Sequence, residues 1–525
     1  MKKIIFSIIG LLFITLTPLA QQLPNRYLQD VSSSFQITKD VVFSTNIPTV
    51  KSFNLFGNRL ANEDSYGQVK TTLRMNIYRP ANDTLTKRPV IIFAFGGGFV
   101  NGSRTEKSMI KLCEAFAKRG FVTATIDYRI GMNIGDKELS KRAVYRALQD
   151  GRSAVRFFRK NATSYGIDPN QIYISGHSAG AFLAYQSVYL DKDSERPAST
   201  RNYFGRADLG GLDAIGDNKT YSNGTLISGK ANSVMGFAGA LGDLSYIENS
   251  SDVPGVYFHS SNDNTVPYNS GEPFSVISWL PGFNLPTVYG SNQMNNRANS
   301  VNASHSFFSY TNRGHNVHFN GSNLYADITP NGSQYFYNNF LKPNQSTITG
   351  NNSICATCLT QNYTANGNAF YYDWQITGGT FVNRNPYNNT VTVSWNSNAT
   401  IRTLTVTPYS RQLARGNTSS VQIKLNSTAT AKASTTTQPF LDSSISFSPN
   451  PFTDNLAITL SNEYVGDVNI AIYDLSGRLV ETRKIVKKEQ TSTENFNSKL
   501  QNAGFYIIQI HTTNNEPIIK KVLKQ

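Results

Sequence analysis

The stretch Gln171–Ser175, which reads QIYIS, leads directly into Gly176-His177-Ser178-Ala179-Gly180 and then into the apolar run Ala181–Ala184. Small residues surround the serine because a sharp turn from a strand into a helix leaves no room for side chains. The strain of such a turn lifts the hydroxyl clear of the sheet edge. The pattern predicts a strand, a tight turn and a helix, with Ser178 as the nucleophile. A small-residue turn that carries a serine by chance is the alternative for five residues taken alone.

A second glycine cluster follows another apolar run. Pro89–Phe95 reads PVIIFAF and ends in Gly96-Gly97-Gly98-Phe99. Main-chain amides can approach a substrate oxygen closely only where side chains are absent. On its own this is equally an ordinary flexible loop, but together with Ser178 it predicts main-chain donors for an oxyanion.

A candidate acid follows the short apolar strand Val256–His259. The next residues read SSNDNTVPY, in which Asp263 precedes Val266-Pro267. A carboxylate at such a turn can orient an imidazole and stabilise it when charged. Taken alone, the segment is also an Asx turn before a proline.

A candidate base follows the last predicted strand of this region, Ser306–Tyr310. The loop beyond it reads TNRGH and brings His315 after a glycine at the strand end. His305 and His318 lie close in sequence, so the choice of His315 depends on the glycine and the strand-end position. A surface histidine is the alternative for each of the three.

The elements occur in the order Ser178, Asp263, His315, which differs from the order in chymotrypsin and subtilisin. In this order, and in its motifs, the sequence resembles the carboxylesterase and lipase branches of the α/β-hydrolase superfamily. The resemblance implies a catalytic triad of these residues, with no cofactor or metal.

The resemblance also implies that the backbone N–H groups of Gly97, Gly98 and Ala179 form the oxyanion hole. Phe95 stands where many members have histidine, which leaves the backbone donors intact and changes the wall of the acyl pocket. Phe95, Phe99 and Tyr268 indicate an apolar pocket rim.

The surrounding pattern predicts an α/β fold with a doubly wound, mostly parallel sheet. Apolar Leu73, Met75 and Ile77 alternate with polar residues in a strand, and Phe121–Ile126 forms another. Between these two strands, apolar residues recur at helical spacing, which predicts a first helix. The same spacing recurs from about Glu138 to Ala162 and predicts a second helix. The residues of the first helix are Met109, Leu112, Cys113, Phe116 and Ala117.

Three further features of this domain have expected roles. Cys113 is expected in the core, since it lies in the apolar stripe of its helix. Asp150 is expected to have a structural role. The polar stretch from about 191 to 233 is predicted to be either a cap over the pocket or a surface excursion.

The chain has 525 residues, too many for one such domain. We predict a signal peptide (1–20), a catalytic domain (21–342), a small β-sandwich (343–425), a polar Ser/Thr-rich linker (426–443) and a C-terminal all-β domain (444–525). The sandwich resembles the PKD-like modules beside secreted enzymes. A spacer is its expected role, and carbohydrate or surface binding is the alternative. Cys355 and Cys358 are expected to form a short-range disulfide or to remain two thiols, since a zinc site needs two more ligands.

The last segment begins with Pro449-Asn450-Pro451, contains Tyr473-Asp474-Leu475-Ser476-Gly477-Arg478 and has a basic end, 520–524. It resembles the type A C-terminal sorting domain of the type IX secretion system. The resemblance implies the outer-membrane secretion machinery as a partner. A fibronectin-like accessory sandwich is the alternative.

The N-terminal region agrees with export. Lys2-Lys3 precedes the apolar stretch Ile4–Leu16, and Ala20 offers a cleavage point, as a signal peptide for Sec export requires. The apolar stretch is too short to cross a bilayer core of about 30 Å, so no transmembrane anchor is predicted. We expect a secreted or cell-surface protein.

The formal net charge is +15, from 49 basic and 34 acidic side chains. The basic residues are scattered and no nucleic-acid-binding motif is present, so nucleic acid is excluded as the main partner. A basic surface favours anionic polysaccharide or lipopolysaccharide through screened attraction.

The sequence therefore predicts a secreted serine hydrolase that cleaves a carboxylic ester, either a small molecule or polymer-linked. A peptidase of the same fold uses the same residues on an amide and is the second reading. A non-catalytic surface-binding relative is the third, although no triad member is missing.

Overall fold

The computed structural model describes residues 25–274, 283–426, 445–462, 464–474, 479–496, 503–512 and 518–525. The predicted signal peptide and, from residue 427 onward, the predicted linker lie outside the described residues, as do Leu475–Arg478 of the C-terminal motif. The chain divides into two compact units. The first comprises residues up to Asn352 together with Leu359–Lys424, and the second comprises Ser353–Cys358 and Leu425–Gln525.

An eight-stranded sheet forms the centre of the first unit. Its strands, in spatial order, are β1 (Phe35–Thr49), β4 (Val69–Pro80), β6 (Val122–Ile126), β5 (Arg88–Ala94), β7 (Ile167–His177), β8 (Ser233–Phe237), β10 (Gly255–Ser260) and β13 (His305–Tyr310). The pairs β1·β4 and β4·β6 are antiparallel, and every other neighbouring pair is parallel. The predicted doubly wound, mostly parallel sheet is confirmed.

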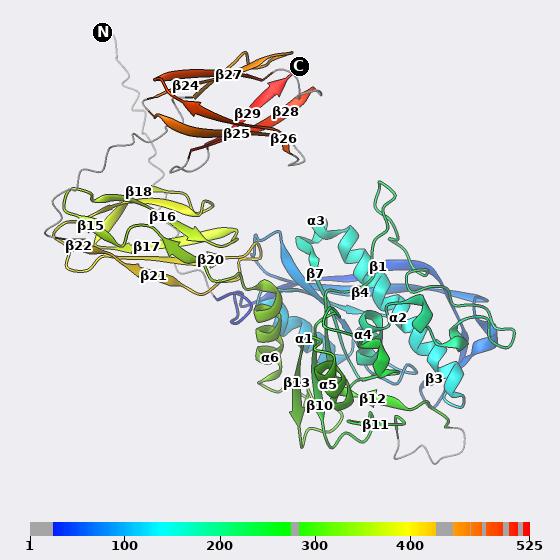
Figure 1. Ribbon diagram of the computed structural model, residues 1–525. Helices are drawn as coiled ribbons and strands as arrows, with labels where there is room; N and C mark the ends of the chain where they lie inside the picture. Colours follow the sequence, from blue (N-terminus) through cyan, green and yellow to red (C-terminus); the bar gives the residue numbers. More distant parts are fainter. Residues whose placement is uncertain are drawn as a thin grey trace, which may run out of the picture. The chain divides into compact units, whose positions relative to one another are not determined.

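Helices cover both faces of this sheet (Figure 1). They are α1 (Lys107–Lys118), α2 (Lys137–Lys160), α3 (Ala162–Tyr165), α4 (Ala179–Tyr189), α5 (Ser291–Ser300) and α6 (Ile328–Phe336). Helix α1 packs with α6, and α2 packs with α4. The predicted helices around Met109–Ala117 and Glu138–Ala162 correspond to α1 and to α2 with α3.

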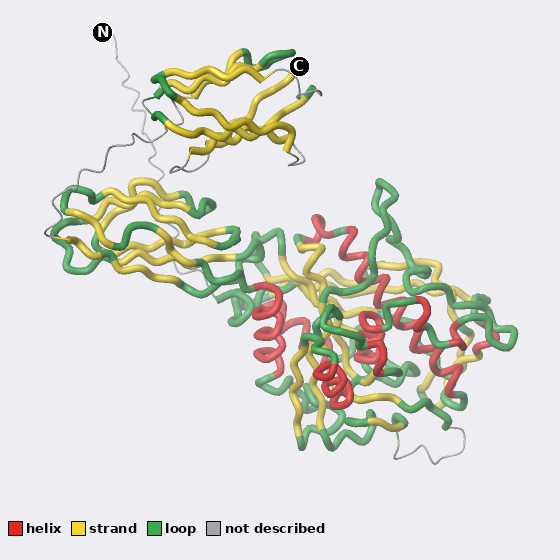
Figure 2. Tube along the Cα trace, viewed as in Figure 1, coloured by secondary structure: helices red, strands yellow, loops and turns green. Residues whose placement is uncertain are grey.

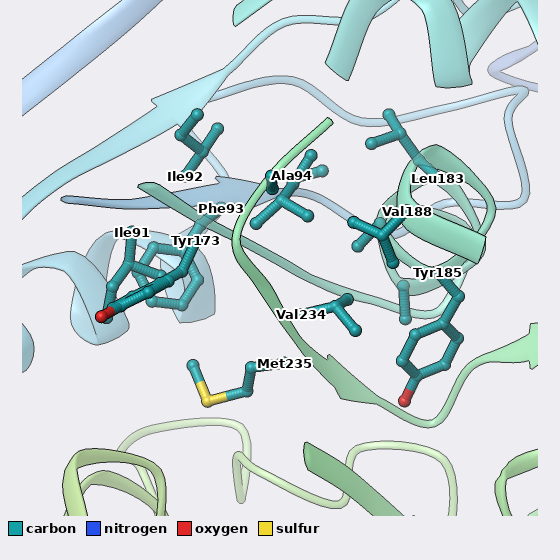
Figure 3. Close-up of a cluster of buried hydrophobic side chains, with 14 of the residues drawn as sticks. Ile91, Ile92, Phe93, Ala94, Tyr173, Leu183, Tyr185, Val188, Val234 and Met235 are labelled. Carbon is teal, nitrogen blue, oxygen red and sulfur yellow. The ribbon is translucent and has the colours of Figure 1, made fainter. Parts of the chain in front are cut away.

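Side chains alternate along the central strands, so successive residues point to opposite faces of the sheet. Helices α1 and α6 lie on one face, and α2 and α4 lie on the other. Phe93 contacts Phe116 of α1, and Tyr173 stacks on Phe336 of α6 at a ring separation of 4.3 Å. Figure 3 shows Ile92 and Ala94 on the other side, with the α4 side chains. Because both faces are covered, β5 is buried throughout and apolar from Pro89 to Ala94.

Short elements connect the main ones in the first unit. They are β2 (Lys51–Leu55), β3 (Asn58–Asn62), η1 (Glu63–Ser65), η2 (Asp193–Glu195), η3 (Ala198–Thr200), β9 (Ala240–Leu241), η4 (Leu244–Tyr246), β11 (Ser270–Gly271), β12 (Val288–Gly290) and η5 (Tyr337–Leu341). Cys113 is fully buried, as expected for a core position. Within the described residues, no helix has the length and apolar character needed to cross a bilayer.

Beyond η5 the described chain consists of strands and loops (Figure 2). The first group is β14 (Thr347–Thr349), β15 (Ser353–Cys355), β16 (Thr360–Asn366), β17 (Tyr371–Thr377), β18 (Gly379–Arg384), β19 (Thr390–Trp395), β20 (Thr403–Tyr409), β21 (Ser419–Gln422) and β22 (Lys424–Asn426). Strands β14, β16, β19 and β18 form one antiparallel sheet, and β17, β20 and β21 form another, around buried Trp374 and Trp395. The strands predicted at 370–376, 390–395 and 404–407 are therefore present, while the PKD-like assignment stays a prediction.

The second unit holds the C-terminal strands. They are β23 (Ile445–Ser448), β24 (Leu456–Ser461), β25 (Gly466–Asp474), β26 (Leu479–Lys487), β27 (Thr491–Phe496), β28 (Gly504–Thr512) and β29 (Ile518–Lys524). They form a three-stranded and a four-stranded antiparallel sheet around an apolar core of their own, which includes Leu456, Ile470 and Ile508. Cys355 and Cys358 of the same unit form a disulfide.

Candidate active site

Ser178 lies at the turn between β7 and α4, with φ 52° and ψ −120°. This is a strained conformation for a residue with a side chain, and it persists only where the surroundings enforce it. The enforcement comes from two close approaches. A Cβ on Gly176 would lie 2.3 Å from the backbone of Gly180, and a Cβ on Gly180 would lie 2.1 Å from the carbonyl oxygen of Ala94. Both glycines are therefore required by space.

The glycine loop follows β5 and contains three consecutive residues with positive φ: 117° at Gly97, 60° at Gly98 and 59° at Phe99. A Cβ on Gly97 would lie 2.3 Å from the carbonyl oxygen of Asn101, so the loop folds tightly on itself. Gly98, Ser178 and Ala179 line one pocket, whereas Gly97 is not among its lining residues. The amide of Ala179 is the first of α4 and, as in any α-helix, has no partner within the helix.

Asp263 and His315 come from the carboxyl ends of adjacent parallel strands, β10 and β13. His315 Nδ1 lies 2.9 Å from Asp263 Oδ2. The other carboxylate oxygen accepts the amides of Thr265 at 2.8 Å and Val266 at 3.0 Å. The segment that the sequence also allowed as an Asx turn therefore carries Asp263, the carboxylate bonded to His315.

Burial alone would raise the pKa of Asp263. The hydrogen bonds to His259 and His315 outweigh burial, and they bring the pKa well below its ordinary value. The carboxylate therefore stays ionised beside the imidazole at neutral pH.

His315 is also close to the elbow. His177, the residue before Ser178, has its Nε2 3.0 Å from the carbonyl oxygen of His315, and the two rings are 4.8 Å apart. Since a carbonyl only accepts, His177 Nε2 carries the proton. Desolvation, together with the charge of His315, lowers the pKa of His177 to about 3, so this ring is neutral at ordinary pH.

The other two histidines considered from the sequence have different partners. His318 is buried against the Oγ of Ser108 at 2.9 Å, and burial lowers its pKa well below the ordinary value. His305 has Nε2 3.0 Å from Asn295 and Nδ1 2.9 Å from the carbonyl oxygen of Ala303. Of the three, His315 is the histidine bonded to Asp263.

Sequence reasoning missed His259, which was read only as the end of a strand. Its ring is fully buried, and its Nε2 lies 3.2 Å from Asp263 Oδ2 and 3.3 Å from the carbonyl oxygen of Val266. Because that carbonyl only accepts, Nε2 is protonated and donates to the carboxylate. Nδ1 faces Ser291 at 3.0 Å. The available signal was the spacing of four residues between His259 and Asp263 at a strand end.

An apolar pocket of about 540 Å³ opens at Ser178. Phe182 and Gln186 of helix α4 line it together with Ser178, the residue before the helix; the three are spaced four residues apart and thus lie on one side. Further wall residues come from other elements and are largely apolar: Phe99, Met132, Val144, Leu148, Leu285 and Val288.

The predicted aromatic rim is correct at Phe99 and wrong at the other two positions. Phe95 is buried and stacks on Tyr128 at 4.2 Å, with the Tyr128 hydroxyl donating to the Phe95 carbonyl, so it lies behind the wall. Tyr268 pairs with Ser309 through its hydroxyl and is also absent from the lining.

The stretch 191–233 contributes to the pocket wall through Ser194, Glu195 and Pro197. Buried arginines of α2 anchor it: Arg142 donates to the carbonyl oxygens of Ser199 and Ala207, and Arg152 pairs with Asp213 at 2.7 Å. This stretch is therefore a fixed part of the site. Asp150 of the same helix pairs with buried Arg129 at 2.9 Å, which is a structural role as expected.

The central sheet, the elbow with its glycine loop and the Asp263–His315 pair define the class of the first unit, an α/β-hydrolase domain. Comparison with known proteins agrees. Residues 75–276 match the BD-FAE family, and residues 446–525 match the secretion system C-terminal sorting domain family. The chain thus carries one domain of each family, and the resemblances to the α/β-hydrolase superfamily and to the sorting domain are confirmed. The BD-FAE match includes Ser178 and Asp263 and ends before His315.

Two curated relatives share short regions with the chain. A neuroligin-like protein, glit-1, of Caenorhabditis elegans is 36% identical over 115 residues, which is 21% of this chain and 15% of that protein. Gut esterase 1 of the same organism is 34% identical over 110 residues, 21% of this chain and 19% of that protein. The chain therefore spans less than a fifth of the length of either relative.

Among solved structures, a thermophilic esterase from the Planctomycetes species Thermogutta terrifontis is similar, with a TM-score of 0.37 and 23% identity. The similarity covers 57% of this chain and 96% of that one.

Proposed function

We propose that the protein is a secreted serine hydrolase that cleaves carboxylic esters through an acyl-enzyme. The observation that carries the proposal is the 2.9 Å contact between His315 Nδ1 and Asp263, next to a serine held in a strained elbow. The match to the BD-FAE family and the likeness to gut esterase 1 support ester chemistry.

The tautomer of His315 follows from its partner. Ionised Asp263 only accepts, so Nδ1 carries the proton and Nε2 is free to accept one. In the proposed mechanism, Nε2 takes the hydroxyl proton of Ser178 while the oxygen attacks the ester carbon. Asp263 stabilises the imidazolium and keeps its negative charge.

The amides of Gly97, Gly98 and Ala179 are proposed to hold the oxyanion of the tetrahedral intermediate. The presence of Gly98 and Ala179 in the pocket lining supports two of these donors directly. Collapse of the intermediate breaks the ester C–O bond, and the leaving alcohol takes the proton from His315. Water then attacks the acyl-enzyme with His315 again as base, which releases the acid and restores Ser178.

We further propose that the C-terminal domain directs export through type IX secretion and that the mature protein acts outside the cell. The match of residues 446–525 to the sorting-domain family supports this proposal. The apolar wall residues favour a substrate whose acyl part is apolar.

The test is Ser178→Ala measured on short-chain nitrophenyl esters, with fluorophosphonate labelling in parallel. We expect a loss of at least about 10⁴-fold in kcat and no labelling, because the nucleophile is absent. Ser194→Ala is the matched control, since Ser194 lines the same pocket and has no role in the proposed chemistry. Undiminished hydrolysis by Ser178→Ala would overturn the proposal, and matched amide substrates turned over faster than esters would favour the peptidase.

A further inference from the structure

Two turns of the catalytic unit share an unusual sequence and geometry. Phe56-Gly57 connects β2 with β3, which is labelled in Figure 1, and has φ values of 49° and 81°. Phe204-Gly205 has φ values of 46° and 78°. It lies between Tyr203 and Arg206, whose amides each donate to the other's carbonyl oxygen. Both are two-residue hairpin turns with Phe-Gly at the tip, called here the aromatic turns.

Phenylalanine is poorly suited to the first position of such a turn. Two successive positive φ values favour Asn, Asp or Gly there, because a bulky side chain in the left-handed region is strained. Burial in the fold does not offset this strain, since Phe56 is 97% exposed and Phe204 is 85% exposed. Two residues that violate the local preference in the same way indicate a role outside the fold itself.

Both aromatic turns are fastened to elements around the pocket. In the β2–β3 hairpin, the amide of Arg59 donates to the carbonyl oxygen of Val100 at 2.7 Å, next to the pocket residue Phe99. The amide of Ala61 donates to the carbonyl oxygen of Met132, which also lines the pocket.

The second turn connects to the same region. Arg206 pairs at 2.8 Å with Asp64 of η1, the element that follows β3. The segment that leads to this turn supplies the pocket wall at Glu195 and Pro197. Only Gly57 and Asn58 separate Arg59 from Phe56, so this tip follows directly on the strand contact at Val100.

Apolar and cationic side chains accompany the tips. Phe53 and Leu55 of the hairpin are also exposed, and Tyr203 packs edge-on against Phe204. Residues 51–62 contain Lys51 and Arg59 and no acidic residue, whereas both arginines of residues 201–206 are ion-paired, Arg201 with Asp193 and Arg206 with Asp64. Lys51 and Arg59 are both exposed.

We propose that the aromatic turns dock the protein on an anionic lipid surface, with the phenylalanines at the acyl boundary and the flanking cations at the headgroups. Exposed aromatic side chains beside lysine and arginine suit this interface, because apolar burial and headgroup attraction add together. Docking in this way brings the pocket to the lipid surface. The inference concerns binding and does not depend on the proposed ester hydrolysis.

The experiment is co-sedimentation of the full chain with vesicles of equal parts phosphatidylcholine and phosphatidylglycerol, and with vesicles of phosphatidylcholine alone. We expect binding to the anionic vesicles that weakens with added salt. The double variant Phe56→Ser/Phe204→Ser is expected to lower the partition coefficient about 100-fold, roughly tenfold for each phenylalanine removed from the interface.

Leu226→Ser is the matched control, because Leu226 is 78% exposed elsewhere in the stretch 191–233 that contains Phe204. It is expected to bind within about twofold of the unaltered chain. Thermal unfolding followed by circular dichroism verifies that the double variant is folded. Ser178→Ala should bind like the unaltered chain, which separates this test from that of the proposed hydrolysis.

Three outcomes would overturn the inference. They are no sedimentation of the unaltered chain, equal sedimentation with both vesicle types, and full binding by the folded double variant. Adsorption of the unaltered chain to an uncharged polyester film in the absence of vesicle binding would assign the aromatic turns to a polymer surface instead.

Discussion

The elbow and the aromatic turns both combine glycine with a residue of positive φ, two positions away at the elbow and adjacent at the aromatic turns, yet they use glycine for different reasons. At the elbow, a Cβ on Gly180 would lie 2.1 Å from the carbonyl oxygen of Ala94. At the aromatic turns, nothing lies within 4 Å of a Cβ built on Gly57 or Gly205. The elbow glycine is required by space, and the turn glycines are required only by their backbone angles.

This difference shows how strongly the surrounding structure constrains each region. Ser178 is fixed by backbone packed on both sides, which holds its side chain in a precise position. The aromatic turns project into solvent, where packing imposes nothing on the side chain. Phenylalanine at their tips therefore calls for an external explanation, whereas serine at the elbow is explained within the fold.

The largest expected effect is on the elbow. Gly180→Ala forces a methyl group into backbone that cannot move without separating α4 from β5. We expect a loss of more than about 3 kcal/mol in the free energy of unfolding and loss of ester hydrolysis. Denaturant unfolding followed by far-UV circular dichroism measures it. Gly211→Ala is the control, since the nearest atom to its Cβ is 3.8 Å away. Equal stability of the two variants would contradict the space argument.

The next effect concerns the support behind the elbow. His259→Gln removes the ring that donates to Asp263, so His315 loses its fixed orientation. We expect kcat to fall about 10- to 100-fold, with KM nearly constant and the pH profile of kcat displaced, since the group acts through Asp263. His305→Gln on the neighbouring strand should leave kcat within about twofold. A change confined to thermal stability would mean that His259 is only structural.

The next effect, which is smaller per pH unit than that of Gly180→Ala, is expected for acid stability. The unfolded chain protonates His177 and His318 below about pH 6.5, whereas the native pKa of His177 is about 3 and that of His318 is also lowered. The unfolded state thus binds more protons, and stability falls as the pH drops from about 6.5 towards 4, by about 1.4 kcal/mol per pH unit for each ring.

The variant His177→Asn tests this expectation, because it should remove about half of the slope contributed by the two rings. Denaturant unfolding at several pH values measures the slope. A variant whose stability falls as steeply as that of the unaltered chain would show that His177 titrates in the folded state.

The smallest effect is expected at the aromatic turns. Gly57→Asn should change the free energy of unfolding by no more than about 0.5 kcal/mol, because asparagine tolerates the left-handed region and the space is open. Gly57→Val, with a β-branched side chain at φ 81°, should cost about 1–2 kcal/mol. Calorimetry measures the free energy of unfolding of both variants. Equal losses would mean that space, and not the backbone angle, limits the side chain at position 57.

The success of prediction from the sequence depended on how local each feature is. The elbow was predictable because strand, turn and helix are contiguous from Gln171 to Ala184 and each part follows its own periodicity. Asp263 and His315 were predictable only through family resemblance, since 52 residues separate them. The role of His259 was not predictable, because it depends on the turn after β10, which brings the Asp263 carboxylate back next to His259.

The buried arginines of α2 and the two aromatic turns were also missed. Arginine is ordinarily exposed, so the sequence gives no reason to expect Arg142 and Arg146 in the interior. They are buried where Glu63 pairs with both, and carbonyl groups of Ser199 and Ala207 accept from Arg142. Phe56 and Phe204 look like core residues in the sequence, and only the positive φ values and exposure distinguish them.

The sequence by itself determined the α/β sheet, the turn that carries Ser178 and the change to β-rich sequence further along, because these depend on periodicity and on small residues next to one another in the chain. Only the tertiary structure decided which histidine meets Asp263, which aromatic residues line the pocket and which face solvent. These outcomes depend on distances between segments far apart in sequence, and a one-dimensional pattern does not contain those distances.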